Sequence, residues 1–546
     1  MSDGNIQSRR IMIYLSCAFL ALVLAITVIV RIRLLQLPLE RDEGEYAYMG
    51  QLLLDGIPPY VNAYTMKLPG VSAVYALFMI CFGQSAAGIH TGLLLTNLLC
   101  ILFVYLLARH LSDGPAAALA GTAYALLSLS QGVMGTAAHA THFVMLFVLT
   151  GLVLQQRQRE AGNLLLFISG ICFGIAFMMK QHAALFCVFA LLLQLRYVLK
   201  DSESRIKSLL RCALLSGGMI IPYALFLIWI WRAGAFAPFW FWTVRYAQEY
   251  TNSGAGGFEA FKTFINQCTA VAVPQFPLWI IAAIGGLLLI RRKNRGPNDT
   301  LIIGFTFFSF LSLCPGLFFR EHYFIMLLPA NALLIGIAVE SYGHTLFSLP
   351  RGRYLHGIPF FFFMAAVGYG LVSEKEYFLT MTPTEVSRTI YGLNPFPEAL
   401  TVARYLKEQT TPDDRILVLG SEPEIYFYAH RLSATGHIYM YGLMEEQPLA
   451  LQMQQEMIRE SEAAHPRYIV TVNCATSWLI RPTSPRAIID WGERYTKERY
   501  EKVGIIDSLQ GGVHSVWGND INGYTPTATS FLSVYKRKEN PPRKPY

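Results

Sequence analysis

The sequence predicts a polytopic α-helical membrane protein with a soluble α/β domain at its C-terminal end. Of its 546 residues, 53% are hydrophobic and only 15% are charged, which is more apolar and less charged than an ordinary soluble domain. Apolar runs of about 15 to 22 residues, long enough to cross a bilayer, recur as far as residue 373 and then stop. We therefore expect a membrane module in residues 1–373 and a soluble domain in residues 374–546.

The distribution of basic residues predicts the orientation of the spans. Arg9 and Arg10 precede the first span, Ile11–Val30, which indicates a cytoplasmic N-terminus. Threading about 11 to 13 spans from there places most Lys and Arg in inner loops, as the positive-inside rule expects. The first loop, about residues 31–70, and the C-terminal domain then lie on the outer side of a bacterial inner membrane.

Charge and cysteine usage exclude other classes. The formal net charge is +8, but the cations are spread between spans, so nucleic-acid binding is not expected. The nine cysteines show no spacing typical of zinc sites or disulfide frameworks.

Several segments are predicted to be something other than a span. Asp42–Asp55 has a near-helical apolar spacing and ends at Gly56, so we expect a helix lying along the membrane interface. Val71–Phe82 is short for a span and suggests a re-entrant or interfacial piece. Residues 232–275 are expected to form a long outer loop.

The C-terminal domain has the pattern of a small α/β fold. Residues 415–419 and 468–472 are apolar runs typical of buried strands, and Phe531–Tyr535 is a later strand candidate. Residues 448–464 predict an amphipathic helix. The basic, proline-rich tail, residues 536–546, is expected to be disordered.

The first outer loop opens with a dense acidic stretch, Arg41-Asp42-Glu43-Gly44-Glu45. Carboxylates in an apolar chain are unfavourable unless they face water or take part in function. Asp42 and Glu43 are candidates for a general base that accepts a proton from a hydroxyl. An equally good interpretation is helix capping, with Asp42 as N-cap and Glu45 three residues later. Glu45 is expected to cap the helix or to pair with Arg41.

Cations at the predicted outer ends of spans are candidates for binding a phosphate. Lys67, in the segment Tyr64–Gly70, and Lys180 are point charges that either hold a phosphate or extend to the interface. Arg245 lies in an aromatic-rich segment that is typical of either an interfacial belt or a lipid groove. Further candidates are Arg320, His322 and Tyr64. His139 and His142 are expected to be core groups rather than metal ligands.

The common feature of these acids and cations is their predicted position on the outer side. They suit a reaction between an anionic lipid-linked donor and a hydroxyl acceptor. They also suit the gate of a transporter for a lipid-linked sugar, although we find no paired halves with broken helices of the kind transporters have. A non-catalytic envelope scaffold is the third possibility.

The chain resembles a known family at several motifs. Asp-Glu directly after the first span, an LLxGxxPY segment and the K-x-P-G of Lys67–Gly70 resemble the bacterial branch of the GT-C glycosyltransferases, the protein-mannosyltransferase-like family that includes lipid A aminoarabinose transferases. The segments REHYF (320–324), GSEPEIYFYAHRLSATG (420–436) and YMYGLMEEQP (439–448) are also similar to those of its bacterial members.

This resemblance implies an inverting transfer of a sugar from a polyprenyl-phosphate donor to a hydroxyl of a protein, lipid or glycan acceptor. Asp42 takes the place of the family's base, with Glu43 as its support, and Lys67 matches a cation that binds the donor phosphate, while Arg245 matches only loosely. Some relatives carry a metal-binding carboxylate just before this lysine. Here the residue is Met66, so we expect metal-independent transfer with no cofactor.

Overall fold

The computed structural model describes residues 3–112, 115–200, 205–252, 256–293, 296–347 and 357–539. The chain divides into two compact units, each built from three separate segments. Unit 1 contains Met1–Leu35, His90–Leu227 and Ala255–Thr380, and unit 2 contains Gln36–Ile89, Ile228–Gly254 and Met381–Tyr546. The first loop therefore shares a unit with the C-terminal segment of the chain.

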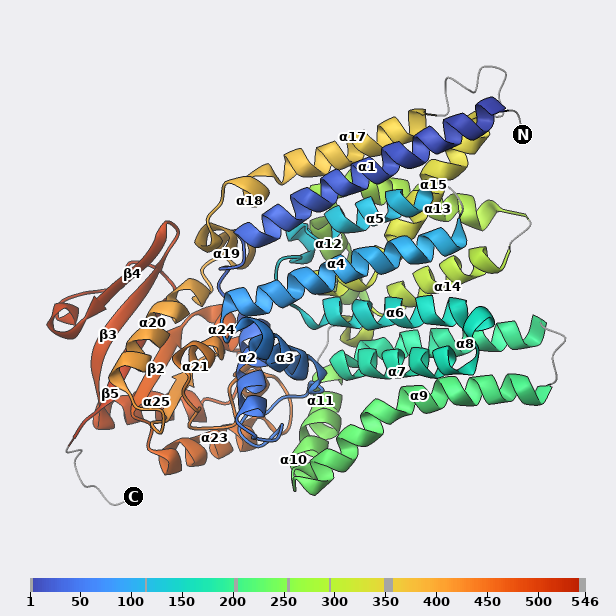
Figure 1. Cartoon of the computed structure of the whole chain (residues 1–546). Coiled ribbons are helices and arrows are strands. Elements are labelled where there is room, and N and C mark those ends of the chain that lie inside the picture. Colours follow the sequence, from blue (N-terminus) through green and yellow to red (C-terminus); the bar gives the residue numbers. More distant parts are fainter. Residues whose placement is uncertain are drawn as a thin grey trace. The chain divides into compact units, whose positions relative to one another are not determined.

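Unit 1 is a bundle of long helices (Figure 1). Its main helices are α1 (Asp3–Arg33), most of α4 (Ala86–Leu111), α5 (Ala116–Leu127), α6 (Ala140–Ala161), α7 (Asn163–Met179), α8 (Ala184–Lys200), most of α9 (Arg205–Arg232), α12 (Gly257–Ala272), α13 (Phe276–Arg291), α14 (Pro297–Leu311), α15 (Leu328–Phe347), α17 (Ile358–Ser373) and α18 (Lys375–Leu379). Five 3-10 turns interrupt or connect them: η1 (Gln131–Val133), η2 (Gln181–Ala183), η4 (Val273–Gln275), η5 (Pro315–Leu317) and η6 (Glu321–Met326).

The helices have the length and composition of a multi-pass membrane protein. Within the described residues, four are long and apolar enough to cross a bilayer: Arg10–Arg33, Ala86–Leu111, Leu209–Arg232 and Gly257–Arg291. Five shorter apolar helices accompany them: Gly70–Phe82, Ala116–Leu127, Asn163–Met179, Gln181–Arg196 and Ile358–Ser373. The predicted fold class, a polytopic helical protein with a C-terminal α/β part, is confirmed.

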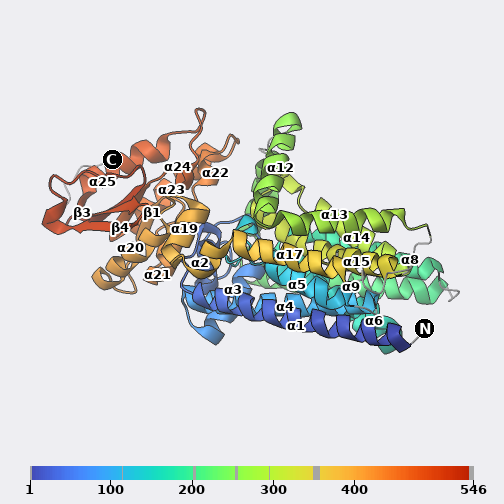
Figure 2. The same ribbon diagram turned by 90° about the horizontal axis from the view of Figure 1, so that it is seen from above.

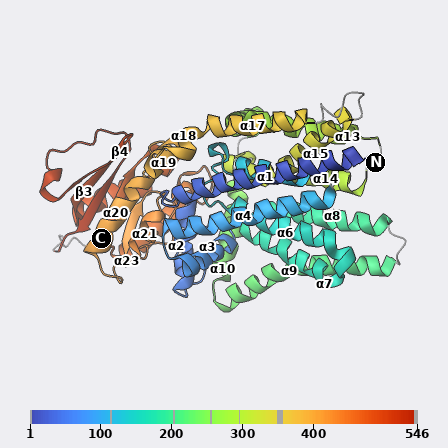
Figure 3. The same ribbon diagram turned by 45° about the horizontal axis from the view of Figure 1, so that its top comes forward.

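The helices of unit 1 pack closely through glycine contacts and through edge-to-face pairs of aromatic rings. A Cβ added at Gly170 of α7 would lie 2.3 Å from the carbonyl oxygen of Leu215 in α9, so these two backbones touch, as in other membrane helix pairs. Helix α17 runs alongside α1 (Figures 1 and 3), where Phe19 meets the rings of Phe360 and Phe363 edge-on.

The predicted outer loop 232–275 is wrong in one respect, because most of its described part is helical. It contains α10 (Phe236–Trp240), the π-helical turn η3 (Phe241–Tyr246), α11 (Ala247–Asn252) and α12. Figure 2 shows α12 standing apart from the other helices of unit 1, and its Phe258 side chain is 77% exposed. Phe258, Phe261, Phe264 and Ile265 recur at helical spacing, and this signal of a helix was overlooked.

Unit 2 begins with two helices from the first loop, α2 (Arg41–Leu54) and α3 (Gly70–Phe82). The helix expected over Asp42–Asp55 is present, but it has no face that is largely exposed. Eleven of its 14 residues are buried, because it packs against α3 and against α21 (Glu424–Ala429) of the C-terminal segment. Helix α3 spans 13 residues, about 20 Å, which is too short to cross an apolar core of about 30 Å.

The C-terminal segment forms a five-stranded sheet in the order β1-β2-β5-β3-β4. The strands are β1 (Ile416–Leu419), β2 (Tyr468–Asn473), β3 (Tyr500–Leu509), β4 (Gly512–Trp517) and β5 (Phe531–Arg537). Strands β1 and β2 are parallel, and the other neighbouring pairs are antiparallel. The helices of this segment are α19 (Pro383–Tyr391), α20 (Phe396–Gln409), α21, α22 (Tyr441–Met444), α23 (Ala450–Ala464), α24 (Ala475–Trp478) and α25 (Ala487–Arg499).

The three predicted strands and the predicted helix of this segment are confirmed as β1, β2, β5 and α23. The hairpin β3–β4 was missed, because polar residues such as Glu501, Lys502 and His514 interrupt its apolar pattern. The expected disordered tail begins too early, since Lys536 and Arg537 belong to β5 and pair with β2 and β3. The rest of that prediction, residues 540–546, lies outside the described residues.

Candidate active site

Helix α2 presents the acidic stretch, and its first turn is fixed by a capping box. Glu40 is the N-cap: its carboxylate accepts the Glu43 backbone N–H at 2.9 Å, and the Glu43 carboxylate accepts the Glu40 backbone N–H at 3.2 Å. The predicted box of Asp42 and Glu45 is therefore wrong by two residues, because the helix begins at Arg41. Glu43 is fully buried in this cap, and the cap leaves Asp42 and Glu45 for other interactions.

Two glycines allow α2 to pack closely enough to hold its position. A Cβ at Gly44 would lie 2.6 Å from the backbone nitrogen of Glu424, at the start of α21. A Cβ at Gly50 would lie 3.1 Å from the carbonyl oxygen of Ser72 in α3. Helix α2 is thus clamped on two sides, and the Asp42 side chain, 23% exposed, remains open to solvent.

Lys67 joins the acidic helix from the next loop. Its ammonium donates to Asp42 Oδ1 at 2.9 Å and to Glu45 Oε2 at 2.6 Å, and it lies 4.6 Å from the centre of the Tyr46 ring. Although burial opposes the charge, the carboxylates of Asp42 and Glu45 raise the pKa of Lys67 well above its usual range. The structure thus brings together two predicted site residues, and it assigns Glu45 to Lys67 rather than to Arg41.

Two hydrogen bonds between the Lys67 backbone and neighbouring side chains hold the loop that carries Lys67. The Lys67 carbonyl accepts a hydrogen bond from the Tyr60 hydroxyl at 2.9 Å, and its N–H donates to Thr65 Oγ1 at 3.2 Å. Tyr60 has a φ of 67°, a left-handed conformation that a non-glycine residue keeps only when its surroundings enforce it. The ammonium is therefore aimed by a fixed loop.

Arg41 connects α2 to the C-terminal segment of unit 2. Its guanidinium is buried and lies 2.9 Å from the Glu422 carboxylate, and it also donates to the Ser421 carbonyl oxygen at 2.6 Å. Burial acts against its charge, but Glu422 outweighs it and raises the pKa of Arg41. Glu422 in turn accepts a hydrogen bond from the Ser477 hydroxyl at 2.7 Å. Buried polar contacts therefore connect α2 with the C-terminal segment within unit 2.

The C-terminal segment also contributes a side chain to the site that the sequence did not reveal. The Tyr439 hydroxyl lies 3.5 Å from Asp42 Oδ1, and the Lys67 ammonium lies 5.8 Å from the centre of the Tyr439 ring. Tyr439 stands in the YMYGLMEEQP segment, but 397 residues separate it from Asp42. The only signal available was that this segment resembles the family.

The other predicted residues of unit 2 have different surroundings. The Tyr64 hydroxyl donates to Glu460 at 2.6 Å, and its ring stacks on Trp242 with centres 5.2 Å apart. Those contacts give Tyr64 a structural role in joining three segments of unit 2. Arg245, on η3, is exposed, with its guanidinium 5.9 Å from the centre of the Phe241 ring.

Three predicted residues belong to unit 1, and two of them, Lys180 and His322, contact the ring of Tyr323 in η6. The Lys180 ammonium lies 4.0 Å from the centre of the Tyr323 ring. His322 meets Tyr323 edge-on at 4.9 Å and stacks on His139 at 4.1 Å. Arg320 is exposed beside Phe318. Lys180, Tyr323 and the stacked imidazoles of His322 and His139 are thus in contact within unit 1.

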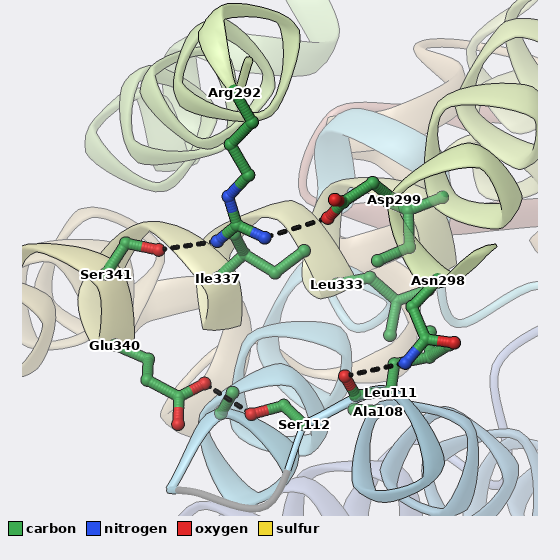
Figure 4. A pocket seen from close by; sticks show the side chains of 12 residues that line it. Ala108, Leu111, Ser112, Arg292, Asn298, Asp299, Leu333, Ile337, Glu340 and Ser341 are labelled. Atoms are coloured by element: carbon green, nitrogen blue, oxygen red, sulfur yellow. Dashed lines mark hydrogen bonds and ion pairs between the residues drawn. The ribbon is translucent and has the colours of Figure 1, made fainter. Parts of the chain in front are cut away.

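Unit 1 also contains a cavity of about 130 Å³, where α4, α13, α14 and α15 meet. Figure 4 shows the Arg292 guanidinium between Asp299 and Ser341, at 2.8 and 3.1 Å, and Glu340 accepting from Ser112. These contacts fasten neighbouring helix ends. None of the predicted site residues lines this cavity.

Comparison with known proteins identifies the architecture. Residues 66–231 match the family model of dolichyl-phosphate-mannose-protein mannosyltransferases. No curated protein sequence matches the chain.

Solved structures of two kinds share its fold. The chain resembles ArnT from Cupriavidus metallidurans, solved with undecaprenyl phosphate, with a TM-score of 0.60 and 15% identity over 95% of this chain and 97% of that one. It also resembles the oligosaccharyltransferase AglB from Archaeoglobus fulgidus, solved with an inhibitory peptide and dolichol-phosphate, with a TM-score of 0.56 and 13% identity over 96% and 76% of the two chains. The family match covers residues 66–231, and the solved structures show that the chain shares the fold of these two membrane glycosyltransferases.

Proposed function

We propose that this protein is an inverting glycosyltransferase that moves a sugar from a polyprenyl-phosphate donor to a hydroxyl acceptor on the outer face of a bacterial inner membrane. The observation that carries the proposal is the pairing of a partly exposed carboxylate, Asp42, with Lys67 on a clamped helix. The lipid phosphates in the ArnT and AglB structures support a lipid-linked donor.

In the proposed step, Asp42 accepts the proton of the acceptor hydroxyl. The hydroxyl oxygen forms a bond to the anomeric carbon of the sugar from the face opposite the phosphate. The bond between that carbon and the phosphate oxygen breaks, and polyprenyl phosphate leaves with the electron pair. One displacement of this kind inverts the anomeric centre and needs no second catalytic carboxylate.

The leaving phosphate needs positive charge. Lys67 is proposed to supply part of this charge, although two of its three N–H groups are already directed to Asp42 and Glu45. Arg245, which is exposed in the same unit as Lys67, is proposed to supply further positive charge. Arg320, Lys180 and His322 belong to unit 1, and their part in binding the phosphate stays a prediction.

We propose that the transfer needs no metal ion. The residue before Lys67 is Met66, whose thioether is a poor ligand for the magnesium or manganese that glycosyl transfer commonly uses. Asp42 and Glu45 instead share the ammonium of Lys67 as their counter-ion.

The function is tested with purified protein in proteoliposomes that contain polyprenyl-phosphate sugars labelled in the sugar. The acceptors are lipid A, a serine- and threonine-rich peptide, and an envelope lipid extract. We expect labelled product and free polyprenyl phosphate in equal amounts, with and without EDTA. Movement of the intact donor across the membrane without cleavage contradicts the proposal and supports a transporter. Loss of transfer in EDTA with recovery on adding a divalent metal overturns the metal-independent part alone.

A further inference from the structure

Asp42 and Glu45 share the ammonium of Lys67, but the two carboxylates differ in how far they are buried. The two residues are three positions apart on α2, which places them on the same helix face. Lys67 donates to both, but the Glu45 side chain is only 3% exposed, whereas that of Asp42 is 23% exposed. One carboxylate of the pair thus faces the interior of unit 2 and the other faces solvent.

The burial of Glu45 makes it the carboxylate that most needs the ammonium of Lys67 as its counter-ion. A buried carboxylate is strongly unfavourable without a counter-ion, and the ammonium of Lys67 lies 2.6 Å from Glu45. Two carboxylates and one ammonium leave a net charge of −1 in this cluster. That remaining negative charge falls on Asp42, the member that solvent reaches.

We propose that Glu45 is a positioning residue that preserves the basicity of Asp42 by sharing the ammonium of Lys67. This inference rests on the proposed function, in which Asp42 is the base. An opposite charge in direct contact typically lowers the pKa of a carboxyl group by about 1 to 3. When a second carboxylate holds the same ammonium, much of that effect is cancelled, and Asp42 remains able to take a proton from a hydroxyl.

Other titratable groups of unit 2 also lie near Asp42. Burial, with the nearby Asp42 and Glu43, raises the pKa of Glu40 well above its usual range, and Glu40 is held in the capping box by its hydrogen bond from the Glu43 backbone N–H. Burial likewise raises the pKa of Tyr46 and of Tyr439, so both phenols keep their protons. Tyr75, on α3, is the third phenol near Asp42. Lys67 and Glu45 are the charged groups through which the test below changes the basicity of Asp42.

The test measures the pH dependence of kcat for transfer in two variants with opposite expected shifts. Glu45→Gln gives the ammonium to Asp42 alone, so we expect the acid limb of the profile to move to lower pH and the plateau kcat to fall about 3- to 30-fold, as expected for a weaker base. Lys67→Gln removes the ammonium, so we expect the acid limb to move to higher pH. Glu45→Asp, which keeps the charge, should restore most of the wild-type profile.

Surface variant Glu408→Gln is the control, since Glu408 is exposed on α20. The pH profile of kcat separates the proposed role from a purely structural one. If Glu45 only stabilised the fold, Glu45→Gln would lower the amount of active protein and leave the pH profile and the KM unchanged, and that result overturns the inference. The proposed function fails separately, if Asp42→Asn retains transfer. Opposite shifts for Glu45→Gln and Lys67→Gln support the inference even where one variant is less stable.

Discussion

At the scale of single residues, the acidic site is one ammonium shared by two carboxylates, since Lys67 donates to both Asp42 and Glu45. Asp42 and Lys67 were singled out by charge, position and family resemblance, and the structure brings them to 2.9 Å. Glu45 was assigned to capping or to Arg41, because residue types alone do not show which of several acids meets which cation. Tyr439 could not be found, since its approach to Asp42 depends on how the C-terminal segment folds back.

Glu424 gives a residue-scale prediction about pH. Burial, together with the nearby Glu422, raises its pKa well above the ordinary 4.5, and among the described residues neither of its carboxyl oxygens has a hydrogen-bonding partner. A carboxyl whose pKa is higher in the folded state contributes stability that is fully present below the unfolded-state pKa and is lost as the pH rises through the folded-state pKa.

We therefore expect Glu424→Gln to match the wild type in thermal stability near pH 4.5 and to exceed it at pH 8. The difference should grow by about 1.4 kcal/mol for each pH unit between the two pKa values. Thermal unfolding of the detergent-solubilised protein across this range measures it, with Glu408→Gln as the exposed control. A constant difference between variant and wild type at all pH values would contradict this account of Glu424.

At the scale of elements, the position of α2 was predictable and its environment was not. The breaking residues from Gly56 onward indicated where the helix ends, and it does end at Leu54. Its alternating apolar and polar residues suggested a helix on a membrane surface, but α3 and α21 cover it. An amphipathic pattern shows which face avoids water without showing whether lipid or protein covers that face.

The contact between α2 and α21 predicts the effect of a single methyl group. Gly44→Ala places a Cβ 2.6 Å from the Glu424 backbone nitrogen and 2.9 Å from its Cα, so one of the two helices must move. We expect a loss of about 1 to 3 kcal/mol in stability and a drop in transfer, because α2 carries Asp42.

The matched control is Gly368→Ala in α17, where a new Cβ meets no atom within 4 Å. An alanine there should leave stability unchanged or raise it, since alanine favours helix over glycine. Unfolding temperatures and transfer rates of the two variants are compared side by side. Equal behaviour of Gly44→Ala and Gly368→Ala would show that the close approach of α2 and α21 has no energetic importance.

At the scale of the whole molecule, composition and apolar run lengths were sufficient to predict a helical membrane protein with a C-terminal α/β part. They did not reveal that the first loop folds together with that part. The ion pair of Arg41 with Glu422 and the contact of Gly44 with Glu424 join positions about 380 residues apart, and no local pattern encodes such pairings. The C-terminal segment is thus part of the unit that builds the acidic site.

The central claim is that Asp42 is the base of a sugar transfer, and Asp42→Asn tests it most directly. Asparagine keeps the size of the side chain and cannot accept the proton, so we expect transfer from labelled polyprenyl-phosphate sugar to fall by a factor of about 10² to 10⁴. The variant should retain the unfolding temperature of the wild type to within a few degrees and should still bind the donor. Transfer at the wild-type rate by a folded Asp42→Asn protein would contradict the account.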